Sequence, residues 1–496
     1  MKETGFHVRC SGWFPGKKKL AIALILVLAG SFAIGGDNFG DRQQILKDFA
    51  AGHFTIADQL ISRALLRQGM TNEETDWLVR QQATMERIRL DFSLTRDQVR
   101  KQLERFFPDL QDGQIAAWEK SGRLEMRLID DAPRYFNRAV ANLFRLDAAA
   151  AEARKEQNNV PAPDPLDAIR LENTGAILKA GKSGGLAEGK KITIEFTLTV
   201  DADAVPAGED VFCWLPFPRE SPPRQKHVVL LAAAPADAVR SPRECLHSSL
   251  YAVQKAVRGA PTVFSYRASF EIWGQWFDPQ RIALGEGPTN KPPAEYLGEE
   301  PPHVVFSPAV RKLAESLSAG EKSPLQRIRK FYLWINGNIP WASALEYSII
   351  DCIPDYVINR GHGDCGMKTF LLMSLARSQG IPARWQSGWM LHPGRENLHD
   401  WCELWYPGIG WVPVDMSFGL QKSNETALKD FYLTGIDSYR MIVNDGFARE
   451  FYPPKKHYRS EPFDFQRGEV EWAKGNIYFD RWEYHLHVLA IEKINK

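Results

Sequence analysis

Residues 361–415 constrain the fold most, because a helix and three strands follow one another there with clear boundaries. The run GHGDCGMKTFLLMSLARSQGIPAR predicts an apolar helix that begins at Cys365 and ends before Gly380, a residue type suited to a left-handed helix terminus. Alternating runs then predict three strands, the last two joined by a tight turn, at 383–391, 398–407 and 410–417. The predicted order is one helix and then an antiparallel sheet.

The chain has 496 residues, too many for one hydrophobic core at about 100–200 residues per domain. Its 44% hydrophobic residues are enough to bury a sizeable core, which excludes a disordered protein. Shifts in composition predict an α+β protein with these parts: 1–36, a signal peptide or signal anchor; 37–157, a helical domain; 158–188, a linker; 189–276, an antiparallel β-sandwich; 277–303, a second linker; 304–496, a core domain with a C-terminal β extension.

The two domains before the core are read from periodicity. Residues 40–156 carry leucines at helical spacing, and the run KITIEFTLTV at 191–200 alternates apolar with polar side chains as a half-buried strand does. The run VFSYRASFEIWG at 263–274 repeats that alternation and is its expected partner. In the core domain, Ser307-Pro308 and Ser323-Pro324 each predict a helix start.

The N-terminus predicts export. Lys17, Lys18 and Lys19 precede an uncharged apolar stretch at 20–35, which is short of the roughly 20 residues that span a bilayer comfortably. The tripeptide 31–33 fits a small-x-small cleavage site, so cleavage is favoured over a retained anchor. We expect a periplasmic or extracellular protein that contacts a membrane only through this segment if it is uncleaved.

The net charge and the number of cysteines indicate which partners and which cysteine pairings to expect. The formal net charge of +1 supplies no basic field for a nucleic-acid backbone, so nucleic acid is not an expected partner. Five cysteines follow the N-terminal segment, an odd number, so four could pair outside the cytoplasm and one would stay free. Cys365 is the expected free thiol.

Three residues in the core domain form a candidate catalytic group. A thiol at a helix N-terminus has its thiolate favoured by the helix dipole, so Cys365 is expected to be a nucleophile with a lowered pKa. His399 on the second strand and Asp415 at the end of the third could lie side by side, with the carboxylate orienting the imidazole. The backbone N–H of Cys365 could donate to an oxyanion, and Gly363 leaves room for a substrate carbonyl.

These residues lie in motifs that resemble the transglutaminase-like superfamily. The resemblance runs through GDC at 363–365, RSQGIPAR at 377–384 and HDWCELWYPGIGWVPVD at 399–415, and covers roughly residues 305–420. It implies a papain-like core in which Cys365 is the nucleophile, His399 the general base and acid, and Asp415 the orienting residue. The preceding sandwich resembles, by pattern only, the domain that often precedes such cores in bacterial proteins.

The resemblance also implies a second oxyanion donor from the segment ahead of the cysteine, where Trp341 and Tyr347 are the available positions. Gly363 and Trp401 are further candidates for the cleft. Asp364 and Asp400 adjoin the three catalytic candidates, and we expect them to be solvated or capping residues.

A zinc site is the competing interpretation, because His362 and Cys365, and His399 and Cys402, form two pairs at x2 spacing. On a strand, residues 399 and 402 project to opposite faces, which disfavours one metal taking both. No metal or cofactor is expected.

The chemistry predicted is attack of the thiolate on an amide carbonyl to form a thioester. Hydrolysis is favoured over acyl transfer, because transfer needs a second substrate and exclusion of water that no motif here indicates. The expected function is that of an exported cysteine hydrolase of peptides, proteins or cell-wall peptide. The alternatives are an acyl transferase that cross-links proteins and a non-catalytic extracytoplasmic binding module.

Overall fold

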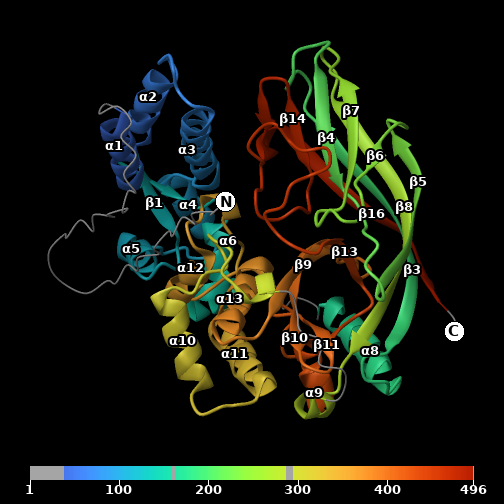
Figure 1. Ribbon diagram of the computed structural model, residues 1–496. Helices are drawn as coiled ribbons and strands as arrows, with labels where there is room; N and C mark the ends of the chain where they lie inside the picture. Colours follow the sequence, from blue (N-terminus) through green and yellow to red (C-terminus); the bar gives the residue numbers. More distant parts are fainter. Residues whose placement is uncertain (1–37, 158–163, 286–293, 495–496) are drawn as a thin grey trace. The chain divides into compact units, whose positions relative to one another are not determined.

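The computed structural model describes residues 38–157, 164–285 and 294–494, and these form two compact units. One unit comprises the described residues up to 157, and the other comprises those from 164 onward (Figure 1). The predicted signal segment at 1–36 lies outside the described residues. Within the described ranges, no helix has the length and apolar character needed to cross a membrane.

The first unit is helical, as the sequence predicts, with one small hairpin. Helices α3 and α4 each begin with a complete capping box, from Thr71 with Glu74 and from Thr95 with Gln98. The elements are α1 (Asn38–Ala51), α2 (Phe54–Leu65), α3 (Asn72–Asp91), α4 (Arg96–Leu103), α5 (Asp112–Lys120), β1 (Met126–Ile129), β2 (Ala132–Tyr135), α6 (Ala139–Leu146) and α7 (Ala148–Gln157).

The second unit contains the predicted antiparallel β-sandwich. Its first sheet has the order β12-β8-β3-β16, with β5 also paired to β8: β3 (Leu186–Val200), β5 (Gln225–Ala234), β8 (Thr262–Trp276), β12 (Gly435–Ile436), β16 (Trp482–Lys493). The second has the order β15-β14-β4-β7-β6: β4 (Asp210–Pro216), β6 (Val239–Arg240), β7 (Ser249–Lys255), β14 (Glu469–Trp472), β15 (Gly475–Ile477). Alternate residues of both sheets, such as Phe196 and Cys213, fill one shared core.

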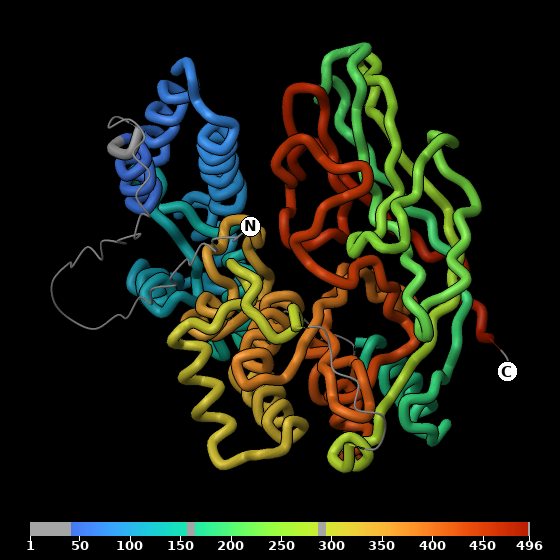
Figure 2. Tube along the Cα trace, viewed as in Figure 1, coloured from blue at the N-terminus to red at the C-terminus, as the bar shows by residue number. Residues whose placement is uncertain are grey.

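The sandwich is not confined to residues 189–276, and the first linker is not all linker. Strands β14, β15 and β16 come from the C-terminal end of the chain, which runs back beside β4 and β3 (Figure 2). The predicted linker 158–188 contains helix α8 (Pro165–Lys179), because Asp164 caps its first turn and Pro165 supplies a preset first helical residue. The expected C-terminal β extension exists, but its strands complete the sheets of the sandwich.

The core domain begins with helices and ends in a sheet of order β11-β10-β9-β13. Ser307 and Ser323 cap α10 and α11 with proline at the first position, as predicted. The remaining elements are α9 (Pro279–Leu284), η1 (Ala294–Leu297), α10 (Pro308–Ser318), α11 (Pro324–Asn338), η2 (Tyr347–Ile349), α12 (Ile353–Arg360), α13 (Cys365–Ser378), β9 (Ala383–Met390), β10 (Asn397–Tyr406), β11 (Gly410–Val414), α14 (Thr426–Lys429), η3 (Phe431–Leu433), β13 (Arg440–Asn444) and η4 (Phe479–Arg481).

The sheet of the core domain shares its hydrophobic core with the sandwich, and Trp389 joins the two. Its ring lies edge-on to Phe196 of β3 at 6.1 Å and to Tyr484 of β16 at 6.0 Å. Its indole N–H donates to the backbone oxygen of Gln466 at 3.1 Å. Sandwich and core sheet are therefore one packed body, which positions the C-terminal segment against the core sheet.

Replacement of this tryptophan tests the shared core. Trp389→Ala should lower the free energy of local opening by about 3–5 kcal/mol, because it empties a site that both sheets fill. Hydrogen exchange followed by mass spectrometry should then show faster exchange in β3 as well as in β9. Leu489→Ala, at a side chain that is 49% exposed on β16, is the control and should change neither. Faster exchange in β9 alone would show that the two sheets open independently.

Candidate active site

Cys365 is the first residue of α13, as the sequence predicts, and Asp364 caps that helix. The Asp364 Oδ1 atom accepts from the backbone N–H of Met367 at 3.0 Å and from the hydroxyl of Tyr347 at 2.8 Å. Burial raises the pKa of Asp364 to about 6, although both hydrogen bonds oppose this. The expected capping role of Asp364 is confirmed.

Cys365 is partly exposed as a residue, and its thiol bonds to Asp400. Its Sγ donates to Oδ2 of Asp400 at 3.2 Å. Burial, followed by the charges of Asp400 and Asp364, raises the pKa of the thiol well above its ordinary value, while the backbone N–H of Asp400 donates to the sulfur and opposes the rise. The predicted lowering of this pKa is therefore not found in the resting arrangement, because burial of the thiol and two nearby carboxyl groups outweigh the helix N-terminus.

His399 and Asp415 are brought together as the sequence predicts. The His399 Nε2 and Asp415 Oδ2 atoms are 2.7 Å apart, and both side chains are buried. A carboxylate can only accept, so Nε2 carries the proton and Nδ1 is the ring nitrogen able to take one. The other oxygen of Asp415 accepts from the backbone N–H groups of Ser417 and Phe418, both at 3.0 Å, which fixes the carboxylate.

Arg440 of β13 completes this arrangement and is not among the candidates named from the sequence. Its Nη2 lies 2.9 Å from Asp415 Oδ2, and its Nη1 lies 3.1 Å from Oδ2 of Asp437. Burial alone would raise the pKa of Asp415, but the charges of His399 and Arg440 hold it well below its ordinary value. The sequence contains one indication of this role, an arginine in the apolar run RMIVN. A buried charge there would destabilise the fold unless an opposite charge paired with it.

The thiol of Cys365 is hydrogen-bonded to the residue that follows His399 and not to His399 itself. His399 and Asp400 are successive residues of β10, and the thiol contacts Asp400. In the part of the chain that the structure describes, no hydrogen bond joins Cys365 Sγ to His399. The assignment of Cys365, His399 and Asp415 as a catalytic group stays a prediction, and it requires the thiol to turn from Asp400 toward Nδ1.

The candidates for the second oxyanion donor and for the cleft differ in where the structure places them. Tyr347 lies at the site, because a Cβ on Gly366 would collide with its hydroxyl and with Asp400. Trp341 is 41% exposed and its backbone bridges to Gly363 in the loop before α13. Trp401 is fully buried and its N–H already donates to Gln386 at 2.8 Å, so it neither lines a cleft nor offers a free donor here.

Sequence reasoning missed several polar residues around the thiol. Asp400 is only 3% exposed, so the expectation of a solvated residue is wrong. Lys368, one turn along α13 from Cys365, is buried, and burial lowers its pKa to about 8 despite the opposing charges of Asp415 and Cys365. Gln466, from the C-terminal segment, donates to Asp400 Oδ1 at 2.7 Å.

The zinc interpretation finds no support in the described residues. They contain no group of three or more His, Cys, Asp or Glu side chains placed to hold a metal ion. His362 is buried, with its ring centroid 5.9 Å from that of Tyr356. The five described cysteines are all free thiols, so no disulfide joins any two of them.

Removal of Arg440 tests the electrostatics of the His399–Asp415 pair. Arg440→Met leaves two buried carboxylates without their shared cation and should lower the free energy of unfolding by about 3–5 kcal/mol. Arg440→Lys keeps the charge and should lose less. Urea unfolding at pH 7 measures both, and equal losses would show that charge is not the stabilising feature.

The same variant predicts a change in acid stability. Asp415 and Asp437 have lowered pKa values in the folded protein, so they stabilise it above the unfolded value of about 4 and lose this as pH falls. The wild type should lose stability below about pH 4 more steeply than Arg440→Met, in which these pKa values return toward normal.

Residues 311–416 match the family model of the transglutaminase-like superfamily. No curated protein matches the chain. Among solved structures, a candidate cysteine protease of Cytophaga hutchinsonii has 15% identity and a TM-score of 0.41, with 62% of this chain and 93% of that chain covered.

Two further solved structures have lower TM-scores. The periplasmic domain of TgpA from Pseudomonas aeruginosa has 18% identity and a TM-score of 0.23, covering 49% of this chain and 91% of that one. A candidate protease of Parabacteroides distasonis has 11% identity and a TM-score of 0.19, covering 48% and 45%.

The predicted fold class is confirmed, since a helical N-terminal part, antiparallel sheets and the matched core are all present. The matched segment contains the helix that starts at Cys365, strands β9 to β11 and the His399–Asp415 pair. The chain therefore contains a transglutaminase-like core, and residues 311–416 belong to the transglutaminase-like superfamily.

Proposed function

We propose that the protein is an exported cysteine hydrolase that cleaves amide bonds in peptides, proteins or cell-wall peptide through a thioester on Cys365. The observation that carries the proposal is the buried pair of His399 and Asp415, 2.7 Å apart, in the same core that presents Cys365 at a helix N-terminus. The superfamily match supports a papain-like cysteine enzyme in general. The proposal goes beyond this general class in two respects, namely that the substrate is a peptide or protein and that the protein is exported.

The chemistry assigns one role to each residue. The proton of Cys365 passes to Nδ1 of His399, and the thiolate attacks the amide carbonyl carbon. The C–N bond breaks as the imidazolium gives its proton to the leaving amine, which leaves a thioester. Water then attacks the thioester, His399 takes and returns its proton, and the acid and free thiol are released. Asp415 holds the ring and stabilises the imidazolium throughout.

The backbone N–H of Cys365 is the first oxyanion donor in this proposal. Tyr347 is the second candidate, because its hydroxyl lies against the first turn of α13. That hydroxyl donates to Asp364, so it would have to be shared with a substrate oxygen. Hydrolysis is proposed over acyl transfer because no residue described here is assigned to a second, amine substrate.

Three substitutions test the catalytic assignment on a peptide library read by mass spectrometry. Cys365→Ala should abolish cleavage, and Asp415→Asn should lower turnover by about 10²–10⁴ while Arg440 still bonds the amide oxygen. His399→Ala should also lower turnover strongly. Asp480→Asn, at an exposed acid in η4, is the matched control and should retain full turnover.

Other results of the same experiment would indicate an acyl transferase or a binding module instead of a hydrolase. Ligation of library amines to acyl groups, instead of cleavage, would indicate an acyl transferase with the same residues. Binding of peptides by wild type and Cys365→Ala alike, without cleavage by either, would indicate a binding module. Full turnover in Asp415→Asn would contradict the role given to the His399–Asp415 pair.

Export is tested separately. The apolar stretch 20–35 after three lysines should be removed or inserted in a membrane in the native host. Fractionation followed by N-terminal sequencing should find the protein outside the cytoplasm, with a new N-terminus near residue 34 if the segment is cleaved. An intact N-terminus in the cytosolic fraction would contradict export.

A further inference from the structure

We propose that Asp400, held in place by Asp464 and Gln466, keeps the thiol of Cys365 protonated in the resting protein, and that protonation of Asp400 releases it. This inference rests on the proposed function, because it concerns the same nucleophile. Asp400 touches the sulfur and is assigned a regulatory role, while Asp464 and Gln466 act through it as positioning residues.

The contact between Asp400 and the sulfur carries the argument. The Cys365 Sγ donates to Asp400 Oδ2 at 3.2 Å, so the thiol proton is directed away from His399. A negative charge at this distance disfavours a second negative charge on sulfur. The thiol is therefore held in the form that cannot attack a carbonyl.

A second carboxyl group raises the pKa of Asp400. Asp464 is buried, and its carboxylate can accept a hydrogen bond from a protonated Asp400, which favours the protonated form of Asp400. Both oxygens of Asp400 already accept, from Cys365 and from Gln466. In this arrangement Asp400 is therefore the carboxylate, and when it takes up a proton it can donate that proton in a hydrogen bond to Asp464.

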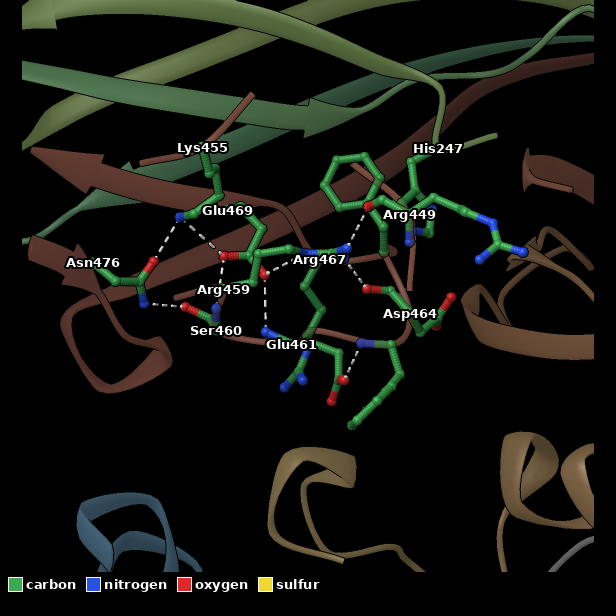
Figure 3. Close-up of polar contacts among 12 residues, drawn as sticks. His247, Arg449, Lys455, Arg459, Ser460, Glu461, Asp464, Arg467, Glu469 and Asn476 are labelled. Carbon is green, nitrogen blue, oxygen red and sulfur yellow. Dashed lines mark hydrogen bonds and ion pairs between the residues drawn. The ribbon is translucent and has the colours of Figure 1, made fainter. Parts of the chain in front are cut away.

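The irregular C-terminal segment 445–468 holds these two side chains in position. Figure 3 shows residues of this segment turned toward Glu469, with Lys455 Nζ at 3.3 Å and the backbone N–H groups of Ser460 and Glu461 both at 2.8 Å. Gln466 also donates to the backbone oxygen of His399 at 2.9 Å. The carboxyl pair is thus built on a rigid, buried ionic network that lies beyond the superfamily match.

Neighbouring groups decide how Asp400 titrates. Asp464 receives hydrogen bonds from Ser387 of β9 at 2.5 Å and from Asn444 of β13 at 3.4 Å. The titratable and charged groups that face the pair or the thiol from the packed elements are Asp364, Cys365 and Lys368 of α13, Tyr347 of η2, His399 of β10, and Arg459, Glu461 and Arg467 of the C-terminal segment.

Burial and then the charges of Asp464 and Asp364 raise the pKa of Asp400 well above its ordinary value. When pH falls through this raised value, Asp400 takes up a proton, loses its charge and stops accepting from the thiol. The backbone N–H of Asp400 still donates to the sulfur, so thiolate formation then becomes easier. The thiol of Cys365 should thus gain reactivity, relative to an ordinary thiol, as the medium becomes acidic.

The test is alkylation of the full-length protein with iodoacetamide, read at each cysteine by peptide mass spectrometry. Asp400→Asn keeps the shape and the backbone donor but removes the charge, so alkylation of Cys365 at pH 7 should rise about tenfold for each unit by which its pKa falls. Cys245, also partly exposed, is the internal reference. Asp480→Asn is the control and should match the wild type. An unchanged or lower rate in Asp400→Asn would overturn the proposal, the lower rate indicating that Asp400 is a base.

A second variant leaves Asp400 in place and does not depend on Asp400→Asn folding. Asp464→Asn can donate an N–H to Asp400 but cannot share a proton or a charge with it, so the pKa of Asp400 should fall. The ratio of Cys365 to Cys245 alkylation should rise on acidification in the wild type, and this rise should move to lower pH in Asp464→Asn. Identical pH profiles in the two proteins would overturn the proposal.

Alkylation needs no substrate, so this test and the test of the hydrolase fail independently. Faster labelling of Asp400→Asn in a protein that cleaves no peptide would remove the hydrolase and keep the control of the thiol by Asp400. If the protein cleaves peptides in a way that depends on Cys365, but Asp400→Asn is labelled at the wild-type rate, the hydrolase is kept and the control of the thiol by Asp400 is removed.

Discussion

The Asp415 carboxylate is the group on which the geometry of the core sheet depends. It lies fully buried between a histidine and an arginine, with its second oxygen on two backbone N–H groups. A buried carboxylate is tolerated only when it is paired and hydrogen-bonded, so these partners must converge for the core to be stable. Strand β13 is therefore fixed beside β9 by electrostatics as well as by its ladder, which also fixes the chain that follows it.

Much of the fold follows from local signals that the sequence carries openly. The capped helix starts at Ser307 and Ser323, the helix that begins at Cys365 and the alternation in β3 and β8 each need only nearby residues to be recognised. The extent of the sandwich could not be predicted in this way, because β14 and β16 join it across more than 200 residues of chain. Such pairing is set by tertiary contacts that no local period encodes.

The residues of the candidate site also differ in whether local sequence could reveal them. Residues inside the contiguous motif, Cys365, His399 and Asp415, were predicted from spacing and resemblance, and the structure places the last two in contact. Arg440, Asp464 and Gln466 come from later segments and reach the site through the fold, so spacing gave no hint of them. Asp400 was visible but misjudged, because the face of β10 that it occupies is buried by α13 and the C-terminal segment.

Two aspartates in this site show how environment assigns opposite roles to one side chain. Asp415 is hydrogen-bonded to His399 and paired with Arg440, so its pKa is lowered and it stays a carboxylate. Asp400 is buried beside another carboxyl, so its pKa is raised, and as a charged group it favours a neutral thiol at Cys365. In the proposed mechanism Asp415 orients the base, and a charged Asp400 opposes loss of the thiol proton. The balance between them depends on the protonation of Asp400, which places control of the nucleophile in the residue next to its expected base.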